Sequence, residues 1–380
     1  MKVVIALDSF KGCLSSPEAC QAAAQGVSLA DPSVSSLLMP LSDGGEGLTE
    51  VLTHAMHGQM VSVSVHGPMM EPMTAQYGIV NGNMAIIEMA AACGLPLVPI
   101  EQRDPERTTT FGFGEMISDA LGHGCNQFIL GIGGSATNDA GIGMLQALGA
   151  KVVFADQAQP NDHQENTLIA CGGNLSQIVS VDASPLSHIY NNVSILVASD
   201  VQNPLFGPEG AAFVFAPQKG ASSQAVLRLD QGLRHVFDLS HSCQSLPGDG
   251  AAGGLGFALR HYLHATMQSG IDLVLDQLQF DELIKDADLV ITGEGKSDAQ
   301  TLMGKVPAGV LHHAQLQSIP VHLIAGCIED QEDLSAGGFS DLHCINDNDF
   351  APLNELLKPE RAKRNIQETV RSIIREFSKQ

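Results

Sequence analysis

The sequence predicts an α/β protein of two domains: a doubly wound, Rossmann/flavodoxin-like domain with a parallel sheet, and an inserted α/β domain with a mixed sheet. Short apolar runs, each followed by a glycine-containing loop and a helical pattern, recur at both ends of the chain, as in βαβ units. Between these ends the segments alternate in polarity and include a hairpin pattern. The 380 residues are enough for two domains. We therefore predict a discontinuous domain from 1–60 and 281–380 and an inserted domain from 61–280.

The first elements follow from local patterns. Val3–Leu7 is continuously apolar, which predicts a strand buried on both faces. A helix is expected to begin just after Ser15, because Ser15 and Glu18 fit a capping box. Ser35–Met39 predicts the next strand, and a glycine-rich loop then leads into a helix that ends near His57.

The middle of the chain predicts a mixed sheet. An Asn-Gly-Asn turn between two apolar segments indicates a hairpin. The strands expected here are 61–65, 76–80, 84–89, 128–132, 195–198 and 213–215, with a helix at 142–148 and a surface excursion at Asp156–Glu165. Parallel βα units return with strands at Leu289–Thr292 and Val321–Ala325, and the last helix, 361–377, carries a basic, solvated face.

Charge and cysteine content narrow the class of partner. The chain has 42 acidic and 19 basic residues, a formal net charge of −23, which disfavours binding to nucleic acid. Its eight cysteines form no Cys-x-x-Cys pair, as expected of reduced thiols in a cytoplasmic protein. The N-terminal apolar run is too short for a signal peptide, and no segment reaches the roughly 18 apolar residues of a membrane span. We expect no membrane partner, and the oligomeric state, a homodimer included, stays open.

Acidic residues follow several of the predicted strands. In open parallel sheets ligands bind beyond the carboxyl ends of the strands. The acids at such ends are Asp8, Asp43, Asp139, Asp200, Glu294 and Asp298. One such Asp is commonly only a helix cap. A group of them is costly unless a cation or a shared proton offsets the charge, so the functional interpretation is a Mg²⁺ site and a base for a substrate hydroxyl.

A glycine-rich loop at 131–141 is the strongest single feature. It leaves a predicted buried strand and opens a helix, where backbone amides bind phosphate; the alternative is a purely structural turn. Its candidate residues are Gly131, Gly133 and Gly134, which allow close approach, the donors Ser135, Thr137 and Asn138, and Asp139.

A second small-residue loop, 250–256, contains Gly253 and Gly254 and either admits a nucleotide or packs against a neighbour. The widespread nucleotide motifs are absent. Lys296 ends a segment like a Walker A motif, but the required first glycine is Val290. The dinucleotide and protein-kinase motifs are missing too.

The scarce lysines are informative in so acidic a chain. Lys11, Lys219, Lys296 and Lys305 each lie beside a glycine. They are candidates to hold a carboxylate or a transferred phosphoryl group, and solvated surface positions are the alternative. Arg103 and Arg107, just before Thr108–Thr110, are similar candidates.

Taken together, these residues resemble the type I glycerate kinases of bacteria from Lys2 to about Gly326. The matching motifs are Asp8-Ser-Phe-Lys-Gly12, Asp43-Gly-Gly-Glu-Gly47, Ile87-Glu-Met-Ala90, Thr108-Thr-Thr110, Gly131-Ile-Gly-Gly-Ser-Ala-Thr-Asn-Asp139, Asp200, Asn203-Pro-Leu205, Pro217-Gln-Lys-Gly220, Ala251-Ala-Gly-Gly-Leu-Gly256 and Thr292-Gly-Glu-Gly295. Among the departures, Asp249 adds a negative charge close to the second loop.

The resemblance implies transfer of phosphate from ATP to D-glycerate with Mg²⁺, in a two-domain α/β protein with its site in the cleft between domains. It also implies a place in glycerate, glyoxylate or glucarate catabolism, and 2-phosphoglycerate rather than 3-phosphoglycerate as product. Our mechanistic hypothesis has the 131–139 loop, Gly253, Gly254 and Lys296 binding ATP, and Asp200, Glu294 and Asp298 holding the metal. Asp200 or Asp43 is the expected base, with Asp8 beside them and Lys11 or Lys296 neutralising charge. A kinase of another small hydroxy acid and a non-catalytic metabolite-binding protein are the alternatives.

Overall fold

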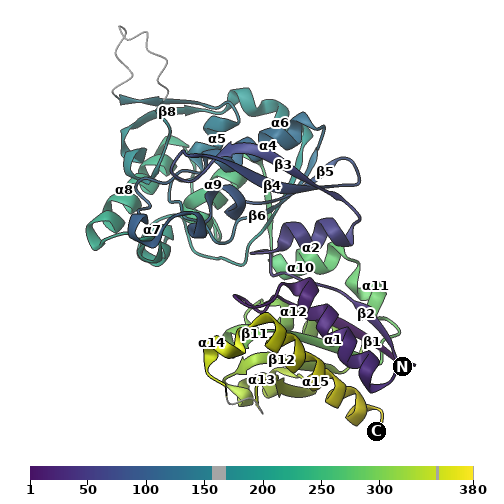
Figure 1. Ribbon diagram of the computed structural model, residues 1–380. Helices are drawn as coiled ribbons and strands as arrows, with labels where there is room; N and C mark the ends of the chain where they lie inside the picture. Colours follow the sequence, from purple (N-terminus) through teal and green to yellow (C-terminus); the bar gives the residue numbers. More distant parts are fainter. Residues whose placement is uncertain (156–167, 348–350, 380) are drawn as a thin grey trace. The chain divides into compact units, whose positions relative to one another are not determined.

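The protein is described by a computed structural model, which covers residues 1–155, 168–347 and 351–379 (Figure 1). The chain forms two compact units, one made of Met1–Ala55 with Ser269–Gln380 and the other of Met56–Gln268. The predicted surface excursion at Asp156–Glu165 lies outside the described residues. Within the described part of the chain, every helix is too short or too polar to cross a lipid bilayer.

The first unit contains a five-stranded parallel sheet in the order β13-β12-β11-β1-β2. Its strands are β1 (Lys2–Leu7), β2 (Ser35–Leu38), β11 (Leu289–Ser297), β12 (Val321–Ile328) and β13 (Asp341–Cys344). The chain moves outward from β1 to β2 on one side, and through β11, β12 and β13 on the other. This is the flavodoxin-like order, whose switch point for ligand binding lies between β1 and β11. The doubly wound prediction is confirmed.

Helices cover both faces of this sheet. The helices are α1 (Ser16–Ala30), α2 (Leu48–Ala55), α10 (Gly270–Gln277), α11 (Phe280–Ile284), α12 (Val306–Leu316), α13 (Gln331–Gly337), α14 (Leu353–Leu356) and α15 (Pro359–Phe377). Helices α1 and α15 lie side by side over one face (Figure 1) and share a core with β1 and β11. Helix α12 packs on β11 and β1. The predicted capping box of Ser15 and Glu18 is present at the start of α1.

The second unit contains a six-stranded mixed sheet in the order β10-β9-β6-β5-β4-β3, which confirms the predicted mixed sheet. Its strands are β3 (Gln59–His66), β4 (Pro72–Val80), β5 (Met84–Glu88), β6 (Gln127–Gly131), β9 (Ser194–Ala198) and β10 (Thr266–Gln268), and β7 (Lys151–Phe154) pairs with β8 (Ile178–Asp182). The hairpin is the antiparallel β4–β5 pair, whereas β5, β6, β9 and β10 run parallel. The helices are α3 (Ala90–Cys93), α4 (Phe111–Gly122), α5 (Ile142–Ala147), α6 (Ser187–Asn192), α7 (Ala211–Phe215), α8 (Ser223–Leu239) and α9 (Ala251–Leu263).

Two local predictions are wrong. Phe213–Phe215 lies in helix α7, not in a strand, because the buried positions are Ala211, Ala212 and Ala216, at helical spacing, while Phe213 and Val214 face solvent. The strand predicted to end at Thr292 continues as β11 through Ser297. Four residues expected in a loop, Gly293, Glu294, Lys296 and Ser297, therefore pair with β12 instead.

Candidate active site

An acidic group lies at the carboxyl edge of the parallel sheet in the first unit. Asp8 directly follows β1 and is only 4% exposed, with its Oδ1 accepting a hydrogen bond from the Ser9 amide at 2.6 Å. Burial, reinforced by the negative charge of Asp43, raises the pKa of Asp8 to about 7, and Lys11 partly opposes this shift. A carboxyl group at the switch point of the sheet is therefore held close to half protonation at neutral pH.

Glu294 lies in β11, next to β1, and is also buried. Its Oε1 accepts hydrogen bonds from the hydroxyls of Thr301 at 2.6 Å and Ser297 at 3.2 Å. Its Oε2 is 3.4 Å from Nζ of Lys305, which also lies 3.8 Å from Asp298 Oδ1. Lys305 thus offsets the charge of two of the three acids that the sequence proposes as metal ligands.

Lys296 has different surroundings from Lys305. Its side chain is 51% exposed, and its Nζ lies 2.9 Å from Glu329 Oε2 and 3.8 Å from Asp298 Oδ2. The hydrogen bond with Glu329 raises the pKa of Lys296. This lysine carries a full positive charge on the surface of the unit, with two carboxylates as partners.

The glycine loop of the second unit is built around a buried lysine. Lys219, at the end of the short helical turn Pro217–Lys219, is 3% exposed. Its Nζ donates to Ser135 Oγ and to the Thr137 carbonyl oxygen, both at 2.7 Å. Burial lowers the pKa of Lys219 to about 7. The sequence singles this lysine out only as one of four beside a glycine, and it cannot show the burial.

Two other residues of this loop have polar atoms without partners. Thr137 and Asn138 are fully buried. Thr137 Oγ1 and both polar atoms of the Asn138 side chain form no hydrogen bond with any residue that the structure describes. Because buried polar groups are nearly always paired, these atoms mark a place where a polar ligand would complete the loop. Gly133 and Gly134, in contrast, are exposed.

Asp139 joins two segments of the same unit. Its Oδ2 accepts hydrogen bonds from the Thr110 amide at 2.7 Å and the Thr110 hydroxyl at 2.8 Å, and from the Gly143 amide at 3.3 Å. Its Oδ1 accepts one from the Gly141 amide. Burial raises its pKa despite these donors. The carboxylate holds the Thr108–Thr110 segment against the start of α5, a helix of six residues that is too short to supply a strong dipole.

The second small-residue loop packs directly on the first. Ala252, Gly253 and Gly254 have left-handed backbone conformations. A Cβ on Gly253 would lie 2.1 Å from the Thr137 carbonyl oxygen. The Ala140 amide donates to the Gly253 carbonyl at 3.0 Å. Close packing therefore accounts for the glycines here. The nearby charge of Asp249, a concern in the sequence, is paired with Arg260.

Asp200 lies at the same sheet edge as the glycine loop. It follows β9 by two residues and is exposed. Strand β9 pairs in parallel with β6, where Ala198 is opposite Gly131. The structure thus brings Asp200 and the 131–139 loop to adjacent strand ends, and it groups Asp8, Asp43, Lys11, Glu294 and Asp298 within the first unit.

The donors of the first unit fit Mg²⁺. Carboxylate oxygens are its usual protein ligands, and the negative charges of Asp43 and Glu294 add to burial in raising the pKa of Asp8. Across the described residues, these carboxylates do not form a group of three ligand atoms within 4.8 Å. Their chemistry suits a cation that binds together with substrate phosphates and keeps several waters.

Comparison with known proteins decides the family. The glycerate kinase family matches residues 3–378 of the chain. The chain is 45% identical over 334 residues to a glycerate kinase of Bacillus subtilis (strain 168), covering 86% of this chain and 85% of that protein. The chain belongs to the glycerate kinase family. It is also 44% identical over 336 residues to the glycerate 2-kinase of Escherichia coli (strain K12), covering 87% of this chain and 86% of that protein.

A solved structure supports the same conclusion. A crystal structure from Salmonella typhimurium LT2, described as a candidate glycerate kinase 2, superposes with a TM-score of 0.86 at 40% identity. The match covers 100% of this chain and 98% of that one. As a member of the glycerate kinase family the chain belongs to a family of phosphotransferases, for which ATP is the implied phosphoryl donor.

Proposed function

We propose that the protein transfers the γ-phosphoryl group of ATP to a hydroxyl of D-glycerate. The observation that carries the proposal is the family match over almost the entire chain, residues 3–378. The similarity to a relative named glycerate 2-kinase supports the hydroxyl at carbon 2 as the acceptor, and 2-phosphoglycerate as the product. Such a reaction belongs in glycerate, glyoxylate or glucarate catabolism.

In the first unit, Asp8 is the proposed general base. A base works best when its pKa lies near the operating pH, and the pKa of about 7 at Asp8 meets this requirement, whereas the sequence favoured Asp43 or Asp200. Asp8 accepts the proton of the glycerate hydroxyl as its oxygen bonds to the γ-phosphorus, and the bond from phosphorus to the bridging oxygen of ADP breaks. Lys11 offsets negative charge beside Asp8.

In the second unit, the 131–139 loop is the proposed phosphate-binding element. Lys219 supplies a cation, and the unpartnered side chains of Thr137 and Asn138 supply polar atoms. Desolvated donors of this kind stabilise developing charge better than solvated ones do, because they are already oriented. Gly253 and Gly254 support this loop by contact.

The proposed Mg²⁺ ligands are those that the sequence indicates: Asp200, Glu294 and Asp298. When bound, Mg²⁺ would neutralise charge on the phosphate oxygens and align them for transfer. Lys305 forms ion pairs with Glu294 and Asp298. Its side chain would therefore have to move away before these two acids could bind Mg²⁺. Asp43, which lies beside Asp8, is a further candidate oxygen ligand. Among the ion pairs of the described residues, none joins Asp43 to a lysine in the way that Lys305 is joined to Glu294.

One assay tests the proposal. Purified protein with Mg·ATP is supplied with D-glycerate, and ADP release is followed by a coupled assay while phosphorus NMR resolves 2- from 3-phosphoglycerate. We expect glycerate-dependent turnover and the 2-phosphate. Faster turnover with lactate, tartronate or glyceraldehyde would assign a different hydroxy acid. Thermal stabilisation by glycerate without any turnover would show a binding protein and overturn the proposal.

A further inference from the structure

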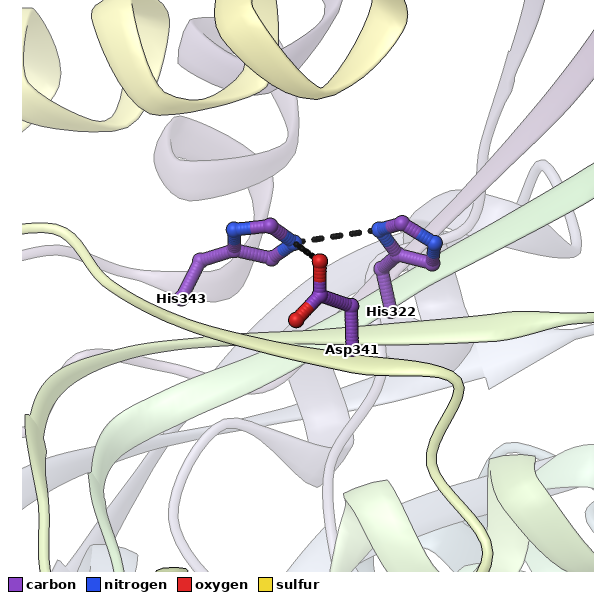
Figure 2. A group of neighbouring side chains, drawn as sticks. All are labelled: His322, Asp341 and His343. Carbon is purple, nitrogen blue, oxygen red and sulfur yellow. Dashed lines mark hydrogen bonds and ion pairs between the residues drawn. The ribbon is translucent and has the colours of Figure 1, made fainter. Parts of the chain in front are cut away.

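Three potential metal ligands converge on β12 and β13 of the first unit's sheet. His322 is the second residue of β12, and Asp341 and His343 are the first and third residues of β13. His343 is opposite Ile324, which is opposite Gly293 of β11. Because successive side chains of a strand point to opposite faces, the three ligands lie on the other face of the sheet from Glu294. Figure 2 shows the two imidazole rings pointing toward one another, with the Asp341 carboxylate reaching the same point. Nothing in the proposed kinase reaction uses these side chains.

The register of the sheet explains why they meet. His322 is opposite Asp341, and Ile324 is opposite His343. Alternate residues of a strand share a face, so His322 and Ile324 lie on one face together with Asp341 and His343. Ile324 belongs to the core beneath α1 and α15, and the Phe377 ring of α15 contacts His322 edge-on at 6.1 Å between centroids. The cluster is thus fixed by backbone pairing and shielded on one side by a helix.

The distances match those of a tetrahedral metal site. His322 Nδ1 lies 3.1 Å from His343 Nε2, which in turn lies 3.5 Å from Asp341 Oδ2. All three ligand atoms lie within 4.8 Å of one another. With zinc–ligand bonds of about 2.0–2.1 Å, tetrahedral geometry places neighbouring ligand atoms about 3.3 Å apart. The two measured separations lie on either side of that value.

Hydrogen bonding alone does not satisfy this group. A ring nitrogen has one proton or one lone pair, yet His343 Nε2 faces both an imidazole nitrogen and a carboxylate oxygen. Asp341 Oδ1 already accepts from the Leu342 amide at 2.9 Å, which leaves Oδ2 for the ring. One cation between the three atoms would satisfy them all.

We infer that His322, Asp341 and His343 form a binding site for Zn²⁺ or a similar first-row divalent metal. Two imidazoles and one carboxylate suit zinc, whereas Mg²⁺ prefers oxygen ligands alone. Three protein ligands leave a fourth position for water. A bound ion would link β13, the edge strand of the sheet, to β12.

Zinc binding by the full-length protein tests this inference. Protein stripped with a chelator is titrated with Zn²⁺ in the presence of excess Mg²⁺, with metal content measured by atomic emission and Co²⁺ as a spectroscopic probe. We expect one ion per chain, visible d–d absorption of tetrahedral Co²⁺, and a higher melting temperature with Zn²⁺. His343→Gln should weaken binding at least 10-fold, and His188→Gln, which alters an exposed histidine of α6, should not.

Asp341→Asn keeps the bond to the Leu342 amide and gives the same test should His343→Gln not fold. Glycerate-dependent turnover with Mg·ATP should stay unchanged in Asp341→Asn, which separates this site from the proposed function. Failure of the wild type to retain Zn²⁺, or equal affinity in the wild type and both site variants, would overturn the inference. So would a sulfur-to-cobalt charge-transfer band, because the ion would then be bound by cysteines.

Discussion

The acidic edge of the first unit and the glycine loop of the second bury ionisable groups of opposite charge. Both lie at the carboxyl ends of parallel strands. At the acidic edge, burial and a neighbouring acid raise the pKa of Asp8 to about 7. In the loop, burial lowers the pKa of Lys219 to about the same value. Each unit thus keeps one ionisable group close to half charged at neutral pH. In the first unit it is a carboxyl group with a raised pKa, and in the second it is a lysine with a lowered pKa.

This difference shows where the net charge of −23 matters. An acidic surface makes it harder to deprotonate a buried carboxyl group and easier to keep a nearby lysine protonated. At Lys219 desolvation outweighs the effect of the surrounding negative charge, because burial is the largest cause of the lowered pKa. Both groups destabilise the folded state in their charged forms, as is expected where function rather than stability determines the residue.

The largest expected effect is on catalysis in the first unit. Asp8→Asn keeps the shape of the side chain and removes the base, so turnover should fall by about 10²–10⁴-fold. The coupled ADP-release assay measures it, and circular dichroism checks that the fold is kept. Asp286→Asn, at an exposed acid of the same unit, is the matched control and should retain full turnover. Turnover of Asp8→Asn within tenfold of wild type would assign the base elsewhere, with Asp43→Asn and Asp200→Asn as the next variants.

The second prediction tests the loop. Lys219→Met preserves the length of the side chain but removes the donor to Ser135 and Thr137, so kcat/KM for ATP should fall by about 10²–10³-fold. The exposed Lys151 of β7 supplies the control, Lys151→Met. Equal kinetics of the two variants would mean that Lys219 only supports the loop. In that case Lys219→Met should change the melting temperature and leave KM for ATP unaltered.

The third prediction uses the opposite signs of the pKa shifts of Asp8 and Lys219. Between about pH 4 and 7 the folded state holds a proton on Asp8 that the unfolded state has lost, so the free energy of unfolding falls as the pH rises. Between about pH 7 and 10 the folded state has lost a proton that the unfolded Lys219 retains, so this free energy rises with pH. Each slope is at most about 1.4 kcal/mol per pH unit.

Chemical denaturation of the two variants across both pH ranges separates these contributions. Asp8→Asn should flatten the dependence only below about pH 7, and Lys219→Met only above it. Loss of both slopes in one variant would contradict the assignment of each slope to a separate group. Unchanged slopes in both variants would contradict the burial argument for both groups.

The fourth prediction concerns the contact between the two loops of the second unit. Gly253→Ala places a Cβ 2.1 Å from a backbone oxygen, at a φ of +70°, so we expect a loss of about 2–4 kcal/mol in unfolding free energy. Gly82→Ala has a similar φ, +74°, with nothing within 4 Å of the added Cβ, and should cost only about 1 kcal/mol. Similar melting temperatures for the two variants would contradict tight packing of the loops.

The sequence predicted much of the fold, because short apolar runs and turn residues are local signals. Val3–Leu7, the capping box at Ser15 and the β4–β5 hairpin all appear as expected. The error at Phe213–Phe215 arose because three apolar residues fit a strand or a helix equally well until the buried neighbours are known. The extension of β11 through Ser297 depends on pairing with β12, which composition does not encode.

The candidate site was predictable only in part. Residue types at strand ends indicated the acids and the glycine loop, and their roles remain predictions. Lys219 contacts Ser135 and Thr137, which are distant from it in sequence. Asn138 lies against the loop around Gly253, which is equally distant in sequence. The hydrogen bond from the Thr301 hydroxyl to Glu294 likewise depends on a turn that follows β11. Such contacts are tertiary, and no pattern in one sequence specifies them.

The smallest expected effect distinguishes two lysines that the sequence treats alike. Lys305→Met leaves the buried Glu294 with hydroxyl donors alone and should cost about 1–3 kcal/mol in unfolding free energy. Lys296→Met breaks only exposed ion pairs and should cost less than about 0.5 kcal/mol. Denaturation midpoints give both values. Because Lys296 contributes so little to stability, any rise of KM for ATP in Lys296→Met would reflect a lost ligand contact, whereas an unchanged KM would mean that its charge only balances Glu329 and Asp298.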